Sequence, residues 1–242
     1  MANAQVILPA GATPDGQPVG QTLDGYGRAW SLPVTAKDWG AAAEGSYFTA
    51  VSGATAGVGV PGTGIIGHAA PTTFDQTKPY LLVYNGSSKM LWPSFLRLHD
   101  TVVSVGGTRM QFTVVRDVGN LYSSGGTAMT VNSTNSEAAT AAYSGVVITQ
   151  GAVVCSAATS NAASMGNYCL RGTIDVVEDT YTFVWGAPDG QVSASRVATV
   201  MDIAQPLPPM GIGPGKCLKI HQWQASQSTG PTFEAVFGFI LR

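Results

Sequence analysis

The sequence has few charged residues. Lysine, arginine, aspartate and glutamate make up 11% of its 242 residues, whereas about a quarter is usual in globular proteins. The scarcity of Lys and Glu argues against many solvent-exposed helices, because these residues normally occupy helix surfaces. A surface with so little charge is poorly suited to a free, concentrated monomer. It favours a protein that is covered by copies of itself or by partners.

Positive charge and long apolar runs are lacking as well. The net charge is −2, the pI is near 5.8, and no basic stripe is present, so we expect no nucleic-acid partner. No run approaches the roughly 18 apolar residues of a membrane-spanning helix, so we expect no membrane partner. The first residues, MANAQVILPAGATPDG, lack the basic and apolar regions of a secretory signal.

The chain has only three cysteines, Cys155, Cys169 and Cys217, and none belongs to a CxxC pair. The odd count and the spacing favour reduced cysteines that act as small, half-buried apolar residues. A bridge between Cys155 and Cys169 stays open as an alternative in an oxidising setting.

Residues 1–75 lack the period of a helix and the strand–turn rhythm of a sheet. Gly, Ala, Thr and Pro dominate, apolar residues are scattered, and charge is too sparse for a solvated disordered tail. We therefore predict an extended, mostly irregular N-terminal arm that packs on its own domain or on a neighbouring subunit. The alternative is a frayed linker with one or two short edge strands. The aromatic residues of the arm are the candidate interface residues: Tyr26, Trp30, Trp39, Tyr47 and Phe48.

Residues 76–242 have short alternating runs separated by turn residues, which is typical of strands. About nine or ten strands are expected, and 136–145 is the only plausible helix. Asn85-Gly86 and Gly106-Gly107 predict hairpin turns, the second one between strands 90–105 and 108–117. This rhythm predicts an all-β domain, an antiparallel β-sandwich or jelly roll.

The C-terminal stretch 206–242 contains two alternating runs around the loop ASQSTGP, which predicts a closing hairpin. Side chains alternate along a strand. One face of the last run is therefore apolar, and it predicts a core strand. That face consists of Phe233, Ala235, Phe237, Phe239 and Leu241.

Two glycine patterns resemble nucleotide-binding motifs only in part. GxGxxG occurs at 57–62 and 62–67, but neither match has a strand before it and a helix after it. The turn 213–216 (GPGK) lacks the first P-loop glycine, because Met210 stands there, and Cys217 replaces the Ser or Thr that holds Mg²⁺. We expect no cofactor, and a tight turn before a strand explains 213–216.

Side chains that might carry chemistry form no recognisable set. His99 and Asp100 are adjacent and point to opposite faces of a strand, and His221 is expected at a surface or an interface. The acidic group Asp175, Glu178 and Asp179 suggests a solvated turn, with a Ca²⁺ loop as the alternative. No GxSxG elbow is present and nothing selects a glycosidase pair. We expect no enzyme, and we assign no catalytic or metal-binding residue.

Three segments resemble β-rich virion proteins of tailed bacteriophages that accompany the head genes. They are NYCLRGTIDVVEDTYTFVWG, PLPPMGIGPGKCLKIHQW and PTFEAVFGFILR, and the resemblance covers about residues 79–242. It implies a capsid cement or decoration protein, made in the host cytoplasm and located on the capsid surface of the virion. The expected partners are the major capsid protein and copies of itself. The alternatives are a tail-fibre or receptor module that binds glycans through Trp185 or Trp223, and a carbohydrate-active enzyme, which the missing signal and acid pair disfavour.

Overall fold

The computed structural model divides the chain into two compact units, Met1–Gly40 and Ala41–Arg242. All the residues that the structure describes belong to the second unit. They are 41–55, 58–59, 66–67, 72–119, 121–137, 145–157, 162–171, 175–186, 194–197 and 200–242.

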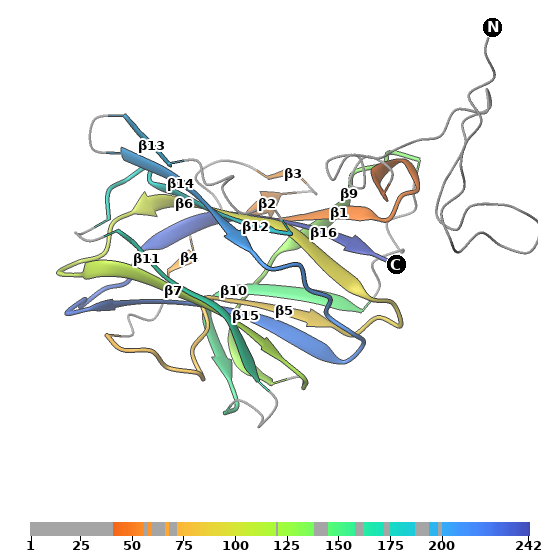
Figure 1. The fold of residues 1–242 in the computed structure, drawn as a ribbon, viewed down its shortest axis with the longest axis horizontal. Helices are drawn as coiled ribbons and strands as arrows, with labels where there is room; N and C mark the ends of the chain where they lie inside the picture. The colour runs from red at the N-terminus through yellow and green to blue at the C-terminus, as the bar shows by residue number, and fades with distance from the viewer. Residues whose placement is uncertain are drawn as a thin grey trace, which may run out of the picture. The chain divides into compact units, whose positions relative to one another are not determined.

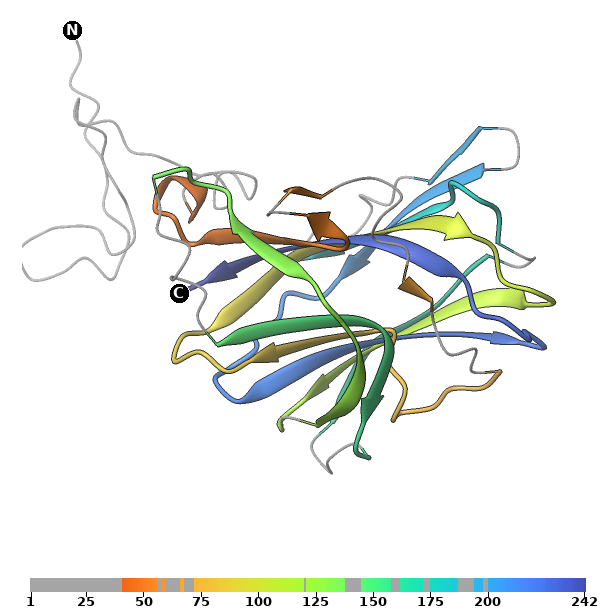
Figure 2. The same ribbon diagram turned by 180° about the vertical axis from the view of Figure 1, so that it is seen from behind.

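Two sheets packed face to face form this unit, as Figures 1 and 2 show from opposite sides. The eight-stranded sheet has the order β13 (Ala194–Val197), β14 (Val200–Leu207), β12 (Thr180–Trp185), β6 (Leu91–Val102), β16 (Thr232–Leu241), β1 (Tyr47–Val51) and β9 (Thr130–Ser133), with β4 (Ile66–Gly67) also paired to β16. The six-stranded sheet has the order β11 (Ala163–Arg171), β7 (Thr108–Asp117), β15 (Lys216–Ala225), β5 (Leu81–Asn85), β10 (Val146–Cys155) and β8 (Tyr122–Ala128). A short ribbon pairs β2 (Ala54–Thr55) with β3 (Val58–Gly59). The predicted all-β sandwich is confirmed.

One pair of neighbouring strands departs from the predicted antiparallel arrangement. β12 and β14 run parallel, with Thr180 opposite Asp202 and Trp185 opposite Leu207. The region 192–203 contains β13 and the start of β14, which pair antiparallel. The eight-stranded sheet is therefore mixed.

The predicted hairpins at residues 85–86, 106–107 and 226–231 are wrong. β5 lies in the six-stranded sheet and β6 in the eight-stranded one, β7 returns to the six-stranded sheet, and β15 and β16 also lie in opposite sheets. Each of these turns crosses the sandwich instead of pairing its two strands. Apolar alternation records which face of a strand is buried, and that face is the same whether the next strand pairs beside it or packs opposite it.

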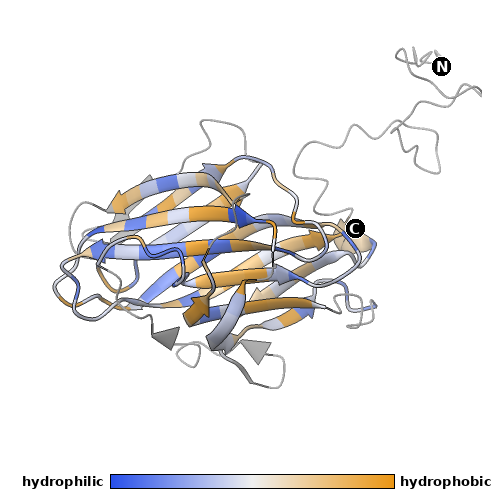
Figure 3. Ribbon diagram, turned by 90° about the horizontal axis from the view of Figure 1, so that it is seen from below, coloured by the Kyte–Doolittle hydropathy of each residue, from blue (hydrophilic) through white to orange (hydrophobic). Residues whose placement is uncertain are grey.

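The interior is rich in aromatic side chains. The predicted apolar face of β16 is confirmed, since Phe233, Ala235, Phe237, Phe239 and Leu241 are all at most 1% exposed. Across the core, the ring of Phe112 on β7 lies 5.3 Å from the ring of Phe183 on β12. The strands carry alternating apolar and polar residues, as the colours in Figure 3 show. Central strands from both sheets thus share one core.

The sandwich includes part of the predicted arm. β1 lies between β16 and β9, and Phe48 is opposite Phe239 in its register with β16. It is therefore an inner strand of the eight-stranded sheet, and the sandwich begins before residue 76. Most of the predicted helix 136–145 lies outside the described residues. Among those that are described, no helix has the length and apolar character to cross a membrane.

Candidate functional site

Three side chains on the outward-facing side of β15 are buried, although they point away from the core. Leu218 and Ile220 belong to the main core, while Cys217, Lys219 and His221 alternate with them and are at most 1% exposed. Residues 72–79 cover part of this outer face, because the ring of Phe74 packs edge-on against His221 at 4.9 Å. Both faces of β15 are therefore enclosed.

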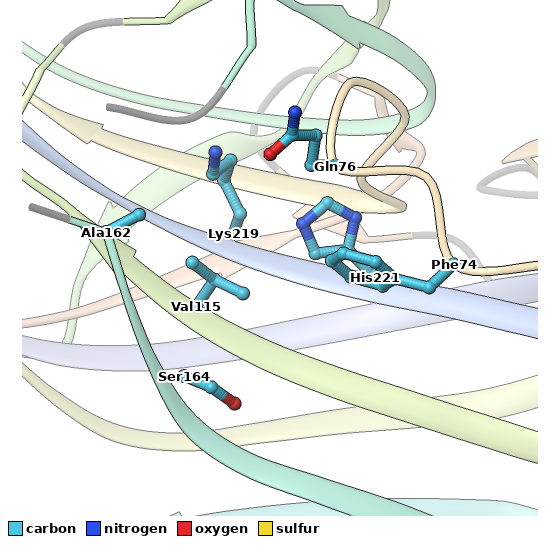
Figure 4. A pocket seen from close by; sticks show the side chains of 7 residues that line it. All are labelled: Phe74, Gln76, Val115, Ala162, Ser164, Lys219 and His221. Carbon is cyan, nitrogen blue, oxygen red and sulfur yellow. The ribbon is translucent and has the colours of Figure 1, made fainter. Parts of the chain in front are cut away.

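A pocket of about 170 Å³ opens between this cover and the sheet. Figure 4 shows its lining side chains from four parts of the chain. The residues that line it are Phe74, Gln76, Val115, Ala162, Ser164, Lys219 and His221. A fully buried lysine, a buried histidine and an amide thus meet at one small cavity, and this is the candidate functional site.

The lysine of this pocket is held by a buried carboxylate. Lys219 Nζ lies 3.2 Å from Asp117 Oδ2, and both side chains are 0% exposed. The other carboxylate oxygen, Asp117 Oδ1, accepts a hydrogen bond of 2.7 Å from the backbone N–H of Val118. Removing two charges from water costs several kcal/mol per ion unless their pairing offsets it. Burial of this ion pair is therefore costly, and the cost is offset by the contact with Lys219 and the hydrogen bond from Val118.

Two thiols lie close to this ion pair. Burial raises the pKa of Cys155 to about 11 and that of Cys217 to about 12, and Lys219 partly opposes both shifts. Both thiols are therefore protonated at neutral pH. They pack with Leu82 and Val153 in a small apolar cluster. All three cysteines are free, so the Cys155–Cys169 bridge is not formed.

A second polar group lies at the end of the sandwich where β6 ends. Asp100, Asp175 and Asp179 are at most 2% exposed. Burial, followed by the neighbouring carboxyl of Asp175 and the charge of Asp179, raises the pKa of Asp100 to about 10. Asp100 is therefore protonated at neutral pH, and a protonated acid donates to an adjacent carboxylate.

The neighbouring Asp175 has the opposite shift. Burial alone would raise its pKa, but hydrogen bonds from Ser104 and Gln224 lower it overall. The backbone N–H of Ser104 donates to Oδ2 at 2.7 Å, its hydroxyl donates to Oδ1, and the Gln224 amide donates to Oδ1 at 3.1 Å. Asp175 is therefore an ionised acceptor that protein donors already surround.

This geometry does not support the Ca²⁺ alternative. Asp175 and Asp179 are buried, whereas Glu178 is exposed and has a left-handed backbone conformation, with φ 76. No group of three or more His, Cys, Asp and Glu side chains in the described part of the chain is arranged to hold a metal ion. The predicted turn is confirmed, since the N–H of Asp179 donates to the carbonyl of Val176 at 3.0 Å. The expected solvated turn is wrong for its two aspartates.

The structure reassigns two of the five candidate interface residues. Phe48 is 1% exposed and stacks on Phe239 with ring centroids 5.5 Å apart, and Tyr47 is 9% exposed. They belong to β1 and are packed within the sandwich, so they are not exposed arm residues. Tyr26, Trp30 and Trp39 lie outside the described residues.

The other tryptophan and histidine residues singled out in the sequence differ in how deeply they are buried. Trp185 is 3% exposed, and its ring packs edge-on against Phe237, so it offers no surface to a glycan. Trp223 is half-buried. His221 is buried within the chain, whereas the sequence predicted a position at a surface or an interface. His99 is half-buried, with its Nδ1 3.4 Å from Thr180 Oγ1.

The glycine patterns behave as the sequence predicts for ordinary turns. The N–H of Lys216 donates to the carbonyl of Gly213 at 3.1 Å, and Gly215 has φ 72 immediately before β15. This is the expected tight turn before a strand. Most of 57–67 lies outside the described residues, and its described parts are β3 and β4.

Sequence reasoning missed the pairing of Lys219 with Asp117 and the exposure of Trp92, which is 45%. The ion pair joins residues 102 positions apart, so no local spacing reveals it. A weak signal exists for Lys219, because Lys and His alternate with apolar residues in a strand between turns. The chain matches no protein-family model, no curated protein and no solved structure.

Proposed function

We propose that this chain is a structural protein of a virus particle, a cement or decoration protein that binds a tailed-phage head shell and copies of itself. One observation carries the proposal. The two sheets end in β8 (YSSGGTA) and β9 (TVNS), which contain no charged residue and no proline, and no described strand pairs with their outer sides. Monomeric proteins usually guard such edges with Lys, Pro or a covering element. Edges that lack such charge and proline favour addition of a partner strand.

The surface beside β8 is apolar. All seven residues of β8 are exposed. Tyr122 is 46% exposed, and Val147 and Val154 on the neighbouring β10 are 47% and 39% exposed. A strand added along β8 gains backbone hydrogen bonds and covers part of this apolar surface. The low overall charge has the same consequence, since such a surface is more stable when it is covered.

Lysine at the edge tests this role. Ser124→Lys and Thr127→Lys place charge on β8, while Ser88→Lys adds the same charge in the exposed loop between β5 and β6. All three proteins should melt like the wild type. Co-sedimentation with purified phage head shells should fall at least tenfold for the β8 variants and stay unchanged for Ser88→Lys.

Two results count against the proposal. A wild-type chain that does not sediment with the shells rules out the cement role. Equal binding of the β8 and Ser88 variants rules out β8 as the contact. Electron microscopy of gold-labelled antibody on intact particles gives a second check, because the proposal requires label on the head and not on the tail.

Trp92 favours a second candidate, a tail-fibre or receptor module that binds glycans. Its ring is 45% exposed and lies next to Met90, which is 37% exposed, and both contact the space above Gly211. An exposed indole offers a flat apolar face with a polar edge. Glycan-array binding that is lost in Trp92→Ala but kept in Ser124→Lys would favour this candidate over the cement role.

A further inference from the structure

Lys219 and Asp117 form a fully buried ion pair between two neighbouring strands. The residues lie on β15 and β7, which are antiparallel neighbours, with Cys217 opposite Asp117 and Lys219 opposite Val115. Both side chains are fully buried, and the amine nitrogen lies 3.2 Å from a carboxylate oxygen. The pairing of β15 with β7 therefore keeps the two residues on neighbouring strands, with their side chains buried side by side.

We propose that Lys219 and Asp117 condense into an intramolecular isopeptide bond that joins β15 to β7. Fixed neighbours react as if at an effective concentration of about 10⁵–10⁸ M. Condensation begins when one proton passes from the ammonium to the carboxylate. That transfer produces the neutral amine and the neutral acid, which are the reacting forms.

The step balances without another reactant. The Nζ lone pair attacks Cγ of Asp117, and a Nζ–Cγ bond forms. The negative charge that develops on Oδ1 is stabilised by the Val118 N–H, which already donates to this oxygen at 2.7 Å. Oδ2 takes a proton from the attacking nitrogen, and the Cγ–Oδ2 bond breaks to release one water molecule. A buried ion pair is thereby replaced by a neutral amide.

The pocket provides the route for this water and for proton exchange. Lys219 lines the cavity of about 170 Å³, and His221 lines it too. Imidazole is the side chain best suited to pass protons near neutral pH, so His221 is assigned as a positioning and proton-transfer neighbour. The product cross-links two inner strands of the six-stranded sheet, which then cannot separate when the chain unfolds.

Intact-mass measurement of the denatured, reduced full chain tests the proposal. The wild type should be lighter than its sequence mass by one water molecule. Lys219→Arg and Asp117→Ala should have their full sequence masses. Asp117→Asn, which keeps a carbonyl and a leaving group, should be lighter by one ammonia molecule.

Trypsin digestion locates the bond, because an acylated lysine is not cleaved. The cross-linked protein should yield a branched peptide in which 117–171 is joined to 217–242. A wild type of full mass overturns the proposal. So does a water loss in which 117–171 is recovered as a linear peptide and cleavage occurs after Lys219, because the loss then lies elsewhere, as at an Asp-Gly succinimide. Both readouts use the wild type, so a variant that fails to fold does not affect them.

Discussion

Replacing Asp100 by Asn should stabilise the protein above about pH 5 and remove a pH dependence. Asp100 is fully buried, and burial with the neighbouring carboxyls raises its pKa to about 10. In the unfolded chain an Asp titrates near pH ~3.9. Between these two pH values the folded state binds a proton that the unfolded state lacks. Stability from this group is therefore complete below about pH 4 and is lost as the pH rises towards 10.

The size of the effect follows from proton linkage. One bound proton changes the free energy of unfolding by about 1.4 kcal/mol for each pH unit. Between pH 5 and pH 8 this amounts to at most about 4 kcal/mol, because relaxation around Asp100, Asp175 and Asp179 lowers the folded-state pKa and shortens the range over which the extra proton is held. An Asn amide is neutral throughout this range, so it has no ionised form whose burial costs stability as the pH rises. Asp175, whose pKa is lowered, loses its contribution only as the pH falls through that lowered value, outside this window.

Guanidinium unfolding of the wild type and Asp100→Asn at pH 5, 6, 7 and 8 measures this difference. Other titrating groups are common to both proteins, so the difference in free energy of unfolding isolates Asp100. The control is Asp202→Asn, which removes a carboxylate at an exposed position on β14. A difference between wild type and Asp100→Asn that is constant from pH 5 to 8, or that moves in favour of the wild type, refutes the reasoning.

Three further perturbations test the sandwich. Removing 1–40 should leave a protein that melts cooperatively. Removing 1–75 also deletes the inner strand β1, so circular dichroism should show an unfolded or aggregated chain. Equal folding of the two truncated proteins would contradict the placement of β1. Phe237→Ala should lower the free energy of unfolding by about 3–5 kcal/mol. Val236→Ala changes a residue on the outer face of the same strand and should lower it by only about 1 kcal/mol. Equal losses in the two variants would contradict the assigned faces of β16. Gly125→Ala should cost about 1–3 kcal/mol in a urea titration, since a methyl group would lie 2.2 Å from the carbonyl oxygen of Ala152 at φ +75; a neutral result means that β8 does not pair as described.

The sequence predicted faces well and strand partners poorly. The alternation of Phe233 to Leu241 identified the buried side of β16 correctly, because burial acts on each residue locally. It gave no information on whether β16 pairs with β15 or packs across from it, and hairpin turns were assumed by default. Pairing is decided by contacts between distant segments, such as β16 with β1 and β6. Residues 1–75 show little regular alternation of apolar and polar residues, and β1 is only five residues long, so the sequence did not reveal this strand.

The candidate site depended even more on distant contacts. In the sequence, Asp117 is one of several scattered carboxylates, and Lys219 stands two residues before His221. Their contact requires β7 and β15 to be adjacent, which the sequence assigned to different hairpins. A lysine that alternates with Leu218 and Ile220 normally faces solvent. The cover formed by residues 72–79, which makes this outer face a buried one, has no sequence signal of its own.

The crossings between sheets also explain why carboxylates are buried at one end of the sandwich. A crossing segment cannot satisfy its backbone groups by pairing its own two strands, so it needs other partners. Asp175 belongs to the crossing from β11 to β12, and it accepts from Ser104 in the crossing from β6 to β7 and from Gln224 at the end of β15. One carboxylate thus ties together three segments that bend between the sheets.

The same end is joined further by backbone bonds. The N–H of Val105 donates to Thr229 across two of the crossings at 3.0 Å, and the N–H of Glu178 donates to the carbonyl of Asp100 at 2.8 Å. This arrangement closes the end with specific polar contacts, whereas β8 and β9 end their sheets with no charge at all. The uncharged edges are where the proposed assembly contacts begin, and this contrast is what the lysine substitutions in β8 test.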